Sequence, residues 1–184
     1  MNRVPYLKRE DLPESKHHIF DQIAKTRGRV SHVFAALINN ADAAEAVTNV
    51  GEYIRYKSPL DPAIRETAIL TTAKEMNNEY EWAQHEPVAR KVGVRDEVID
   101  SILSGKGAMG LPAKEGVFIQ AAKELIKKGQ VSEPTFQALD HLLGVEQTID
   151  FIVTVGYYSM LSRIISSLGV ELDEGLTLNE KFND

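Results

Sequence analysis

No run of alternating β-branched residues occurs in this 184-residue chain, and that absence excludes most folds built on sheets. Apolar residues instead recur every three or four positions between Gly, Pro and Asn stops, which predicts amphipathic helices. We therefore expect an all-α fold, a helical bundle. The helices are expected over residues 17–26, 31–37, 42–55, 62–76, 79–92, 95–104, 113–128, 132–143 and 146–168.

The length suits one domain, so residues 1–184 are expected to form a single domain. Its two ends differ from the helical body. Residues 1–14 contain two prolines and residues 170–184 are acidic, so we expect both segments to be extended arms. A connector rich in Gly lies between two of the expected helices, at residues 105–112.

The strongest helix boundaries enclose residues 62–92. Asp61 is a good N-cap residue, and Pro62 follows at the first helical position, where its missing N–H costs nothing. This helix ends near Asn77-Asn78, and the next helix begins directly after that pair. Such a short turn makes the two helices antiparallel neighbours, so we expect a bundle built on an antiparallel helical hairpin.

The charge balance narrows the classes of partner. The chain has 21 Lys and Arg residues against 27 Asp and Glu residues, a formal net charge of −6, and lacks the basic footprint of a nucleic-acid-binding protein. The N-terminus shows no apolar signal segment. The longest apolar stretch, residues 149–168, contains Asp150 and Arg163, which favours a buried helix over a membrane partner. We expect a cytoplasmic protein that binds a small-molecule substrate.

The chain contains no cysteine. This absence excludes disulfides, cysteine-ligated zinc, thiolate nucleophiles and CxxC redox chemistry. Candidate chemistry must therefore be sought among the acidic residues and the histidines.

The densest cluster of titratable and aromatic residues lies at 79–86. Glu81 and His85 are four residues apart, hence on one helix face, and Trp82, the only Trp of the chain, lies between them. Pro87 removes a helical N–H, so we expect the helix to kink or open beside His85. The alternative is an exposed helix face with an ordinary Glu–His pair, which contributes about 0.3 kcal/mol.

A second acid, Glu66, lies on the preceding helix among apolar residues. Counted from the Asn77-Asn78 turn, Glu66 and His85 come within several ångströms of the same level, at about 1.5 Å rise per residue. A carboxylate on an apolar helix needs a partner, and a Glu–His pair in a half-buried cleft is suited to moving one proton near neutral pH.

Glu66, Glu79, Glu81 and His85 also form a candidate site for a divalent metal ion. Two-carboxylate sites in helical bundles usually repeat a Glu-x-x-His motif on a second helix, and the sequence has no such repeat. We therefore expect neither a metal ion nor another cofactor, and keep a metal-dependent enzyme as a less favoured alternative.

Two segments carry a family resemblance: RETAIL at residues 65–70, and NEYEWAQHEPVA at residues 78–89, followed by Gly93-Val94. Together they resemble the carboxymuconolactone decarboxylase family, which includes alkylhydroperoxidase D-like proteins. The hallmark region covers residues 42–104. The resemblance implies an all-helical alkylhydroperoxidase D-like fold on a helical hairpin, assembled into a homo-oligomer, a trimer or a hexamer.

The thiol branch of that family carries a CxxC motif followed by His, with a Glu on the preceding helix in a proton relay. Alignment on His85 matches this Glu to Glu66, while Asn78 and Glu81 occupy the two cysteine positions. The relay ends are present and the redox centre is missing.

The decarboxylase branch also lacks the thiol pair, and it implies a lactone carboxylic acid from aromatic-compound degradation that loses CO₂. On this analogy His85 is the proton shuttle, Glu66 orients it and Glu81 is a second acid. The expected substrate-binding residues are Asn78, Trp82 and Arg65. Two alternatives remain open: a non-catalytic oligomeric binding protein of the same fold, and a peroxidase-related homologue that has lost its thiol centre.

Overall fold

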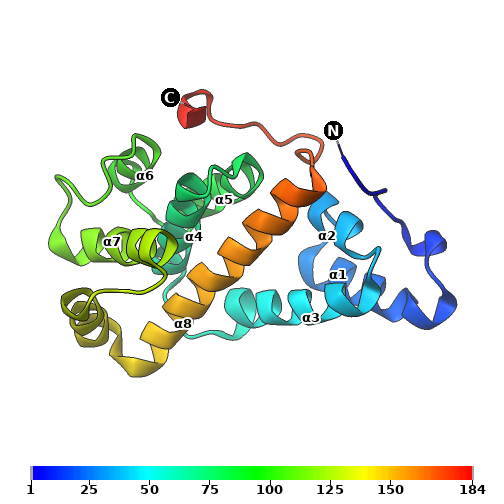
Figure 1. The fold of residues 1–184 in the computed structure, drawn as a ribbon, viewed down its shortest axis with the longest axis horizontal. Coiled ribbons are helices and arrows are strands. Elements are labelled where there is room, and N and C mark those ends of the chain that lie inside the picture. Colours follow the sequence, from blue (N-terminus) through cyan, green and yellow to red (C-terminus); the bar gives the residue numbers. More distant parts are fainter. Residues whose placement is uncertain (1, 184) are drawn as a thin grey trace. The chain divides into compact units, whose positions relative to one another are not determined.

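The computed structural model describes residues 2–183, and its regular structure within that range is entirely helical (Figure 1). This confirms the predicted all-α class. The helices are α1 (His17–Arg27), α2 (His32–Leu37), α3 (Ala41–Glu52), α4 (Pro62–Glu75), α5 (Glu79–Lys91), α6 (Asp96–Leu103), α7 (Ala113–Lys128) and α8 (Glu133–Leu168). Short 3₁₀ turns lie at Arg9–Asp11, Glu14–Lys16 and Glu180–Asn183, and a π-helical turn at Tyr53–Lys57 extends α3.

Local chemistry sets the helix ends at the predicted hairpin. The Asp61 carboxylate accepts hydrogen bonds from the backbone N–H groups of Ala63 and Ile64, at 2.8 and 3.2 Å, and so caps α4. Asn78 caps α5 in the same way, because its side-chain oxygen accepts from the N–H of Glu81. Helix α5 continues through Pro87 to Lys91, so the expected opening of the helix beside His85 is not observed.

Helix α8 is interrupted at Gly144, whose φ of 74° and ψ of 168° are not helical. The left-handed φ suits a glycine because it has no Cβ. The interruption separates the two helices predicted at 132–143 and 146–168, and confirms both.

The chain forms two compact units. One contains residues 2–57 and 163–175, and the other contains residues 58–162 and 176–183. In the first unit α3 packs against α1 and α2, and the buried carboxylate of Asp173 accepts from the backbone N–H of His32 at 2.7 Å. The single-domain organisation stays a prediction.

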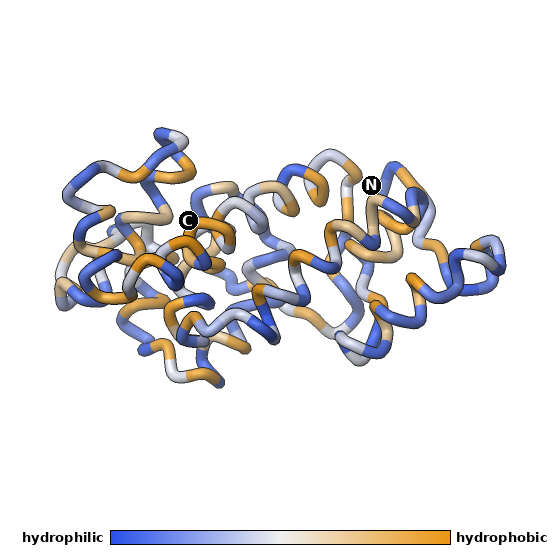
Figure 2. Tube along the Cα trace, turned by 90° about the horizontal axis from the view of Figure 1, so that it is seen from below, coloured by the Kyte–Doolittle hydropathy of each residue, from blue (hydrophilic) through white to orange (hydrophobic). Residues whose placement is uncertain are grey.

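In the second unit α4 is the central helix and packs against α5, α6 and α7, which are grouped around it in Figure 1. Eight consecutive residues of α4, 66–73, are buried. One core cluster includes Leu70, Trp82 and Phe182, and a second includes Phe118 and Phe151. Figure 2 shows hydrophobic and hydrophilic residues alternating over short distances along the trace, as the predicted amphipathic spacing requires.

Helix α8 is long and apolar enough to cross a membrane by composition, and it is the one helix of residues 2–183 that passes this test. Its side chains Phe151, Val155 and Tyr158 are nevertheless buried within the second unit. A core helix of a bundle has the same length and composition, so this finding is weak evidence for a membrane.

Glu124 of α7 provides a test of the loop that leads into α8. Its buried carboxylate accepts from the backbone N–H of Ser132 at 2.7 Å and from Gln120 at 2.9 Å, and these hydrogen bonds lower the pKa of Glu124 to about 2. A carboxyl group whose pKa is lowered by folding stabilises the protein at pH values above its ordinary pKa of 4.5. This stabilisation is lost as the pH falls from 4.5 towards 2.

We expect Glu124→Gln to lower the free energy of unfolding by about 2 kcal/mol at pH 7, because the charged acceptor is lost. The difference from the wild type should shrink between pH 4.5 and pH 2, as measured by urea unfolding at several pH values. The exposed Glu146→Gln is the control and should have no such effect. A pH-independent difference would contradict the assignment.

Candidate active site

The predicted pair of Glu66 and His85 meets between α4 and α5. The Nδ1 atom of His85 lies 2.7 Å from Oε2 of Glu66, and the two residues are 4% and 2% exposed. Glu66 lies among the eight buried positions of α4, where an unpartnered carboxylate would be strongly unfavourable. The short turn between the helices brings its partner to the same level, as the residue count predicted.

Glu81 faces the other side of the same imidazole ring. Its Oε2 atom lies 3.5 Å from Nε2 of His85, and Glu81 is also buried. Both ring nitrogens of His85 therefore face carboxylates. Nδ1 is placed to share a hydrogen with Glu66, and Nε2 faces Glu81 at the longer distance.

Arg65 joins the cluster from α4. Its Nε atom lies 3.6 Å from Oε1 of Glu66, and its side chain is 12% exposed. The cluster thus combines two carboxylates with one guanidinium and one imidazole. Opposite charge beside a buried carboxylate offsets part of its desolvation cost.

Tyr158 of α8 completes one wall of the site. Its ring meets the ring of His85 edge to face, with centroids 5.0 Å apart and planes at 88°. Tyr157 stacks in the same manner on Tyr158, at 5.3 Å. Nothing in the local sequence connects Tyr158 with His85, because the contact depends on how α8 packs within the second unit.

The remaining predicted residues lie on α5. Trp82 is fully buried in the core cluster with Phe182, and its indole N–H donates to Glu86 at 2.8 Å. Asn78 is 3% exposed at the N-terminus of the helix, one turn before Glu81. The binding roles of Trp82 and Asn78 stay predictions.

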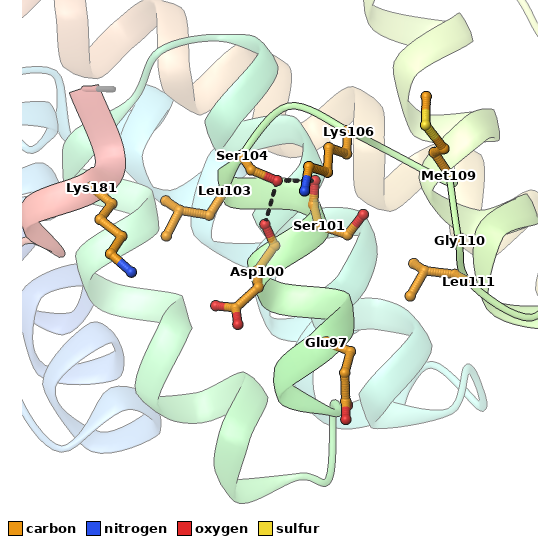
Figure 3. Close-up of a pocket in the computed structure, with 10 residues that line it drawn as sticks. All are labelled: Glu97, Asp100, Ser101, Leu103, Ser104, Lys106, Met109, Gly110, Leu111 and Lys181. Carbon is orange, nitrogen blue, oxygen red and sulfur yellow. Dashed lines mark hydrogen bonds between the residues drawn. The ribbon is translucent and has the colours of Figure 1, made fainter.

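Within residues 2–183 no group of three or more His, Cys, Asp or Glu residues is arranged to hold a metal ion. Both nitrogens of His85 face acids instead. A cavity of about 550 Å³ in the same unit lies elsewhere, against α6 and the connector after it (Figure 3). Its lining includes Glu97 and Asp100 of α6 and Lys181 of the C-terminal segment, and none of the predicted site residues.

Comparison with protein-family models matches residues 41–124 to the carboxymuconolactone decarboxylase family. The match contains the predicted hallmark region, 42–104, and every site residue on α4 and α5. No curated protein matches the chain.

Solved structures share the fold over nearly the whole chain. A peroxidase-related protein of Ralstonia eutropha JMP134, with an alkylhydroperoxidase AhpD core, is 20% identical with a TM-score of 0.79, covering 98% of this chain and 94% of its own. A peroxidase-related protein of Silicibacter sp. TM1040 is 17% identical with a TM-score of 0.73, covering 97% and 91%.

The debrominase Bmp8, in a cysteine-to-alanine variant bound to 2,3,4-tribromopyrrole, is 13% identical with a TM-score of 0.74, covering 93% and 91%. At these identities the likeness concerns the fold, and it confirms the predicted alkylhydroperoxidase D-like architecture.

Removing the carboxylate of Glu66 should expose how much the cluster depends on it. We expect Glu66→Ala to lower the free energy of unfolding by about 3 kcal/mol, because His85 loses its acceptor and Arg65 loses its counter-ion inside the protein. Glu66→Gln should be milder, since an acceptor remains. Urea unfolding measures both, and the exposed Glu79→Ala on α5 is the control, expected within about 0.5 kcal/mol of the wild type. Equal losses for Glu66→Ala and Glu79→Ala would contradict the cluster.

Proposed function

We propose that this chain, whose residues 41–124 match the carboxymuconolactone decarboxylase family, is a cofactor-free lyase for a small lactone carboxylic acid. The observation that supports the proposal most is the buried contact of 2.7 Å between Glu66 and His85, with Glu81 at the other ring nitrogen. An imidazole held between two acids is suited to store one proton and release it to a bound substrate.

The reaction would proceed through an enolate intermediate. The bond between the ring carbon and the carboxylate breaks, CO₂ leaves, and the electron pair moves into the conjugated ring carbonyl to form an enolate. The proton shared by Glu81 and Nε2 of His85 is then delivered to carbon, and solvent restores it. Glu66 holds Nδ1 and so keeps the ring in one tautomer and one orientation.

Two acids beside an anionic substrate need compensation. Arg65, next to Glu66, supplies positive charge at the site, and the proton on the Glu81–His85 pair removes one of the negative charges. The bound pyrrole in the Bmp8 structure supports a small planar ring as the ligand class. We propose Arg65, Asn78 and Trp82 as the substrate-binding residues, and the degradation of aromatic compounds in the cytoplasm as the setting.

A thiol peroxidase needs a thiolate nucleophile and a resolving thiol, and this chain has no cysteine to supply either. The peroxidase-related descriptions of two structural neighbours therefore do not extend to the chemistry proposed for this chain. No observation favours a non-catalytic binding protein over the lyase.

Release of CO₂ from a panel of γ-lactone carboxylic acids tests the proposal. We expect turnover by the wild type, and a fall in kcat of about 10² to 10⁴-fold in His85→Ala, the range for loss of a general acid–base group. His141→Ala changes an exposed histidine of the same unit and should retain wild-type kcat.

Unchanged kcat in His85→Ala would contradict the role of this residue. Thermal stabilisation by the lactones without any release of CO₂ would instead identify the binding-protein alternative.

We also propose that the chain is a homo-oligomer. The outer side of α8 exposes Val145, Ile149, Val153 and Met160, which are 61%, 54%, 37% and 39% exposed. These residues are spaced by helical turns, and Gly156 between them has open space above its Cα. In an antiparallel pair of α8 helices, Ile149 faces Met160 of the second copy and Val153 faces Gly156. A two-fold contact of this kind occurs in a hexamer and is absent from a simple trimer.

Val153→Asp places a charge in the centre of this surface. We expect the wild type to elute as an assembly larger than the 20.5 kDa chain, and Val153→Asp to elute as a smaller species because the charge would be buried unpaired. Size-exclusion chromatography with light scattering measures this. Lys114→Asp changes an exposed residue of α7 and should not alter the mass. A monomeric wild type at micromolar concentration would contradict the proposal.

A further inference from the structure

The side-chain amide of Asn78 contains a buried donor that is not used within the described chain. Its oxygen accepts from the backbone N–H of Glu81 at 2.9 Å, as an N-cap does. Its nitrogen Nδ2 is buried and has no hydrogen-bond partner within residues 2–183. Rotating the amide by 180° would direct two donors at each other, so the cap itself identifies Nδ2 as the unused group.

The position of this donor relates it to the acid–base cluster. Asn78, Glu81 and His85 are three and four residues apart and lie along one face of α5. Side chains on a helix lean towards its N-terminus, so the ring of His85 leans towards Glu81, and Glu81 leans towards Asn78. Nδ2 of Asn78 therefore lies at the N-terminal end of the row formed by Asn78, Glu81 and His85. The last two residues hold the proton of the proposed reaction.

The N-terminus of α5 contributes a favourable field for a negative oxygen, which acts against the negative charges of Glu79 and Glu81 in the first turn. Asn78 is the first residue before a 13-residue helix, whose N-terminus carries partial positive charge. Backbone and side-chain donors at a helix N-terminus are a common anion site, and a neutral amide adds no charge that must be compensated elsewhere. When Glu81 shares the proton of Nε2, its own negative charge is reduced and its repulsion of an anion falls.

We propose that Nδ2 of Asn78 and the N-terminus of α5 form an oxyanion site for the substrate. It binds the ring carbonyl oxygen, which takes up the electron pair released when the carbon–carbon bond to the carboxylate breaks. The pair returns to carbon when the proton arrives from Glu81 and His85, so the site stabilises the charge only while it exists on oxygen. The identity of this oxygen rests on the proposed function, whereas the binding of an anionic oxygen does not.

Acetate is the probe for anion binding, and the full-length protein labelled with ¹⁵N is the sample. We expect the side-chain NH₂ resonance of Asn78 to shift saturably as acetate is added, and the resonance of Asn40, which caps α3, to remain in place. Asn40 has the same capping role without a neighbouring acid–base cluster. Absence of a saturable shift at Asn78 would overturn the proposal whether or not the protein turns over a lactone.

Asn78→Asp is isosteric and keeps the capping oxygen but removes the donor. We expect it to lower Tm, because the new carboxylate is buried one turn from Glu81, and to lower kcat for the lactone by about 10²-fold, the cost of one oxyanion donor. Asn40→Asp should retain both Tm and kcat. If Asn78→Asp fails to fold, Asn78→Ser also keeps a capping oxygen and loses the amide, and the same fall in kcat is expected.

Wild-type kcat in Asn78→Asp or Asn78→Ser would overturn the oxyanion role. A saturable acetate shift at Asn78 without turnover of any lactone would support the anion site and count against the proposed lyase reaction.

Discussion

The burial of one carboxylate, Glu66, determines much of the second unit. A carboxylate removed from water is stable only with a compensating charge and hydrogen bonds, and helix α4 itself supplies the guanidinium of Arg65 at 3.6 Å. The hydrogen-bond partner comes from α5, where His85 approaches to 2.7 Å. The short turn between α4 and α5, with the N-cap Asn78 at its end, keeps these two groups at the same level. Changing the length of that turn would leave a buried charge without its partner.

The rest of α4 explains why Glu66 alone requires such a partner. The helix has several buried polar residues, yet the hydroxyls of Thr67, Thr71 and Thr72 each donate to the carbonyl four residues earlier, at 2.8 Å. These groups are satisfied within the helix and need nothing from neighbouring elements. The contact of Glu66 with His85 is therefore a buried polar connection that joins α4 to α5, whereas these three hydroxyls are satisfied within α4.

The sequence predicts local and hairpin features well and distant contacts poorly. The caps at Asp61 and Asn78, and the meeting of Glu66 with His85, follow from helix rise and a two-residue turn, because both are short-range. The contact between Tyr158 and His85 joins residues far apart in the chain, and no spacing rule reaches that far. The continuity of α5 through Pro87 is the opposite case, since the proline predicts a kink or an opening and the helix runs on without an opening to Lys91.

The absence of cysteine acquires a specific meaning at this site. In the thiol branch that the sequence resembles, the two positions now held by Asn78 and Glu81 carry sulfur, which moves electrons. An acid at the second position lies 3.5 Å from Nε2 of His85, where the proposed function has the two groups share a proton, and an amide at the first position offers a donor. The same two helical positions, three residues apart on one face, serve equally well for a pair of thiols or for an acid and a donor. On the proposed function, the scaffold therefore specifies where the reacting groups lie, and the residue types at these two positions decide whether electrons or protons are transferred there.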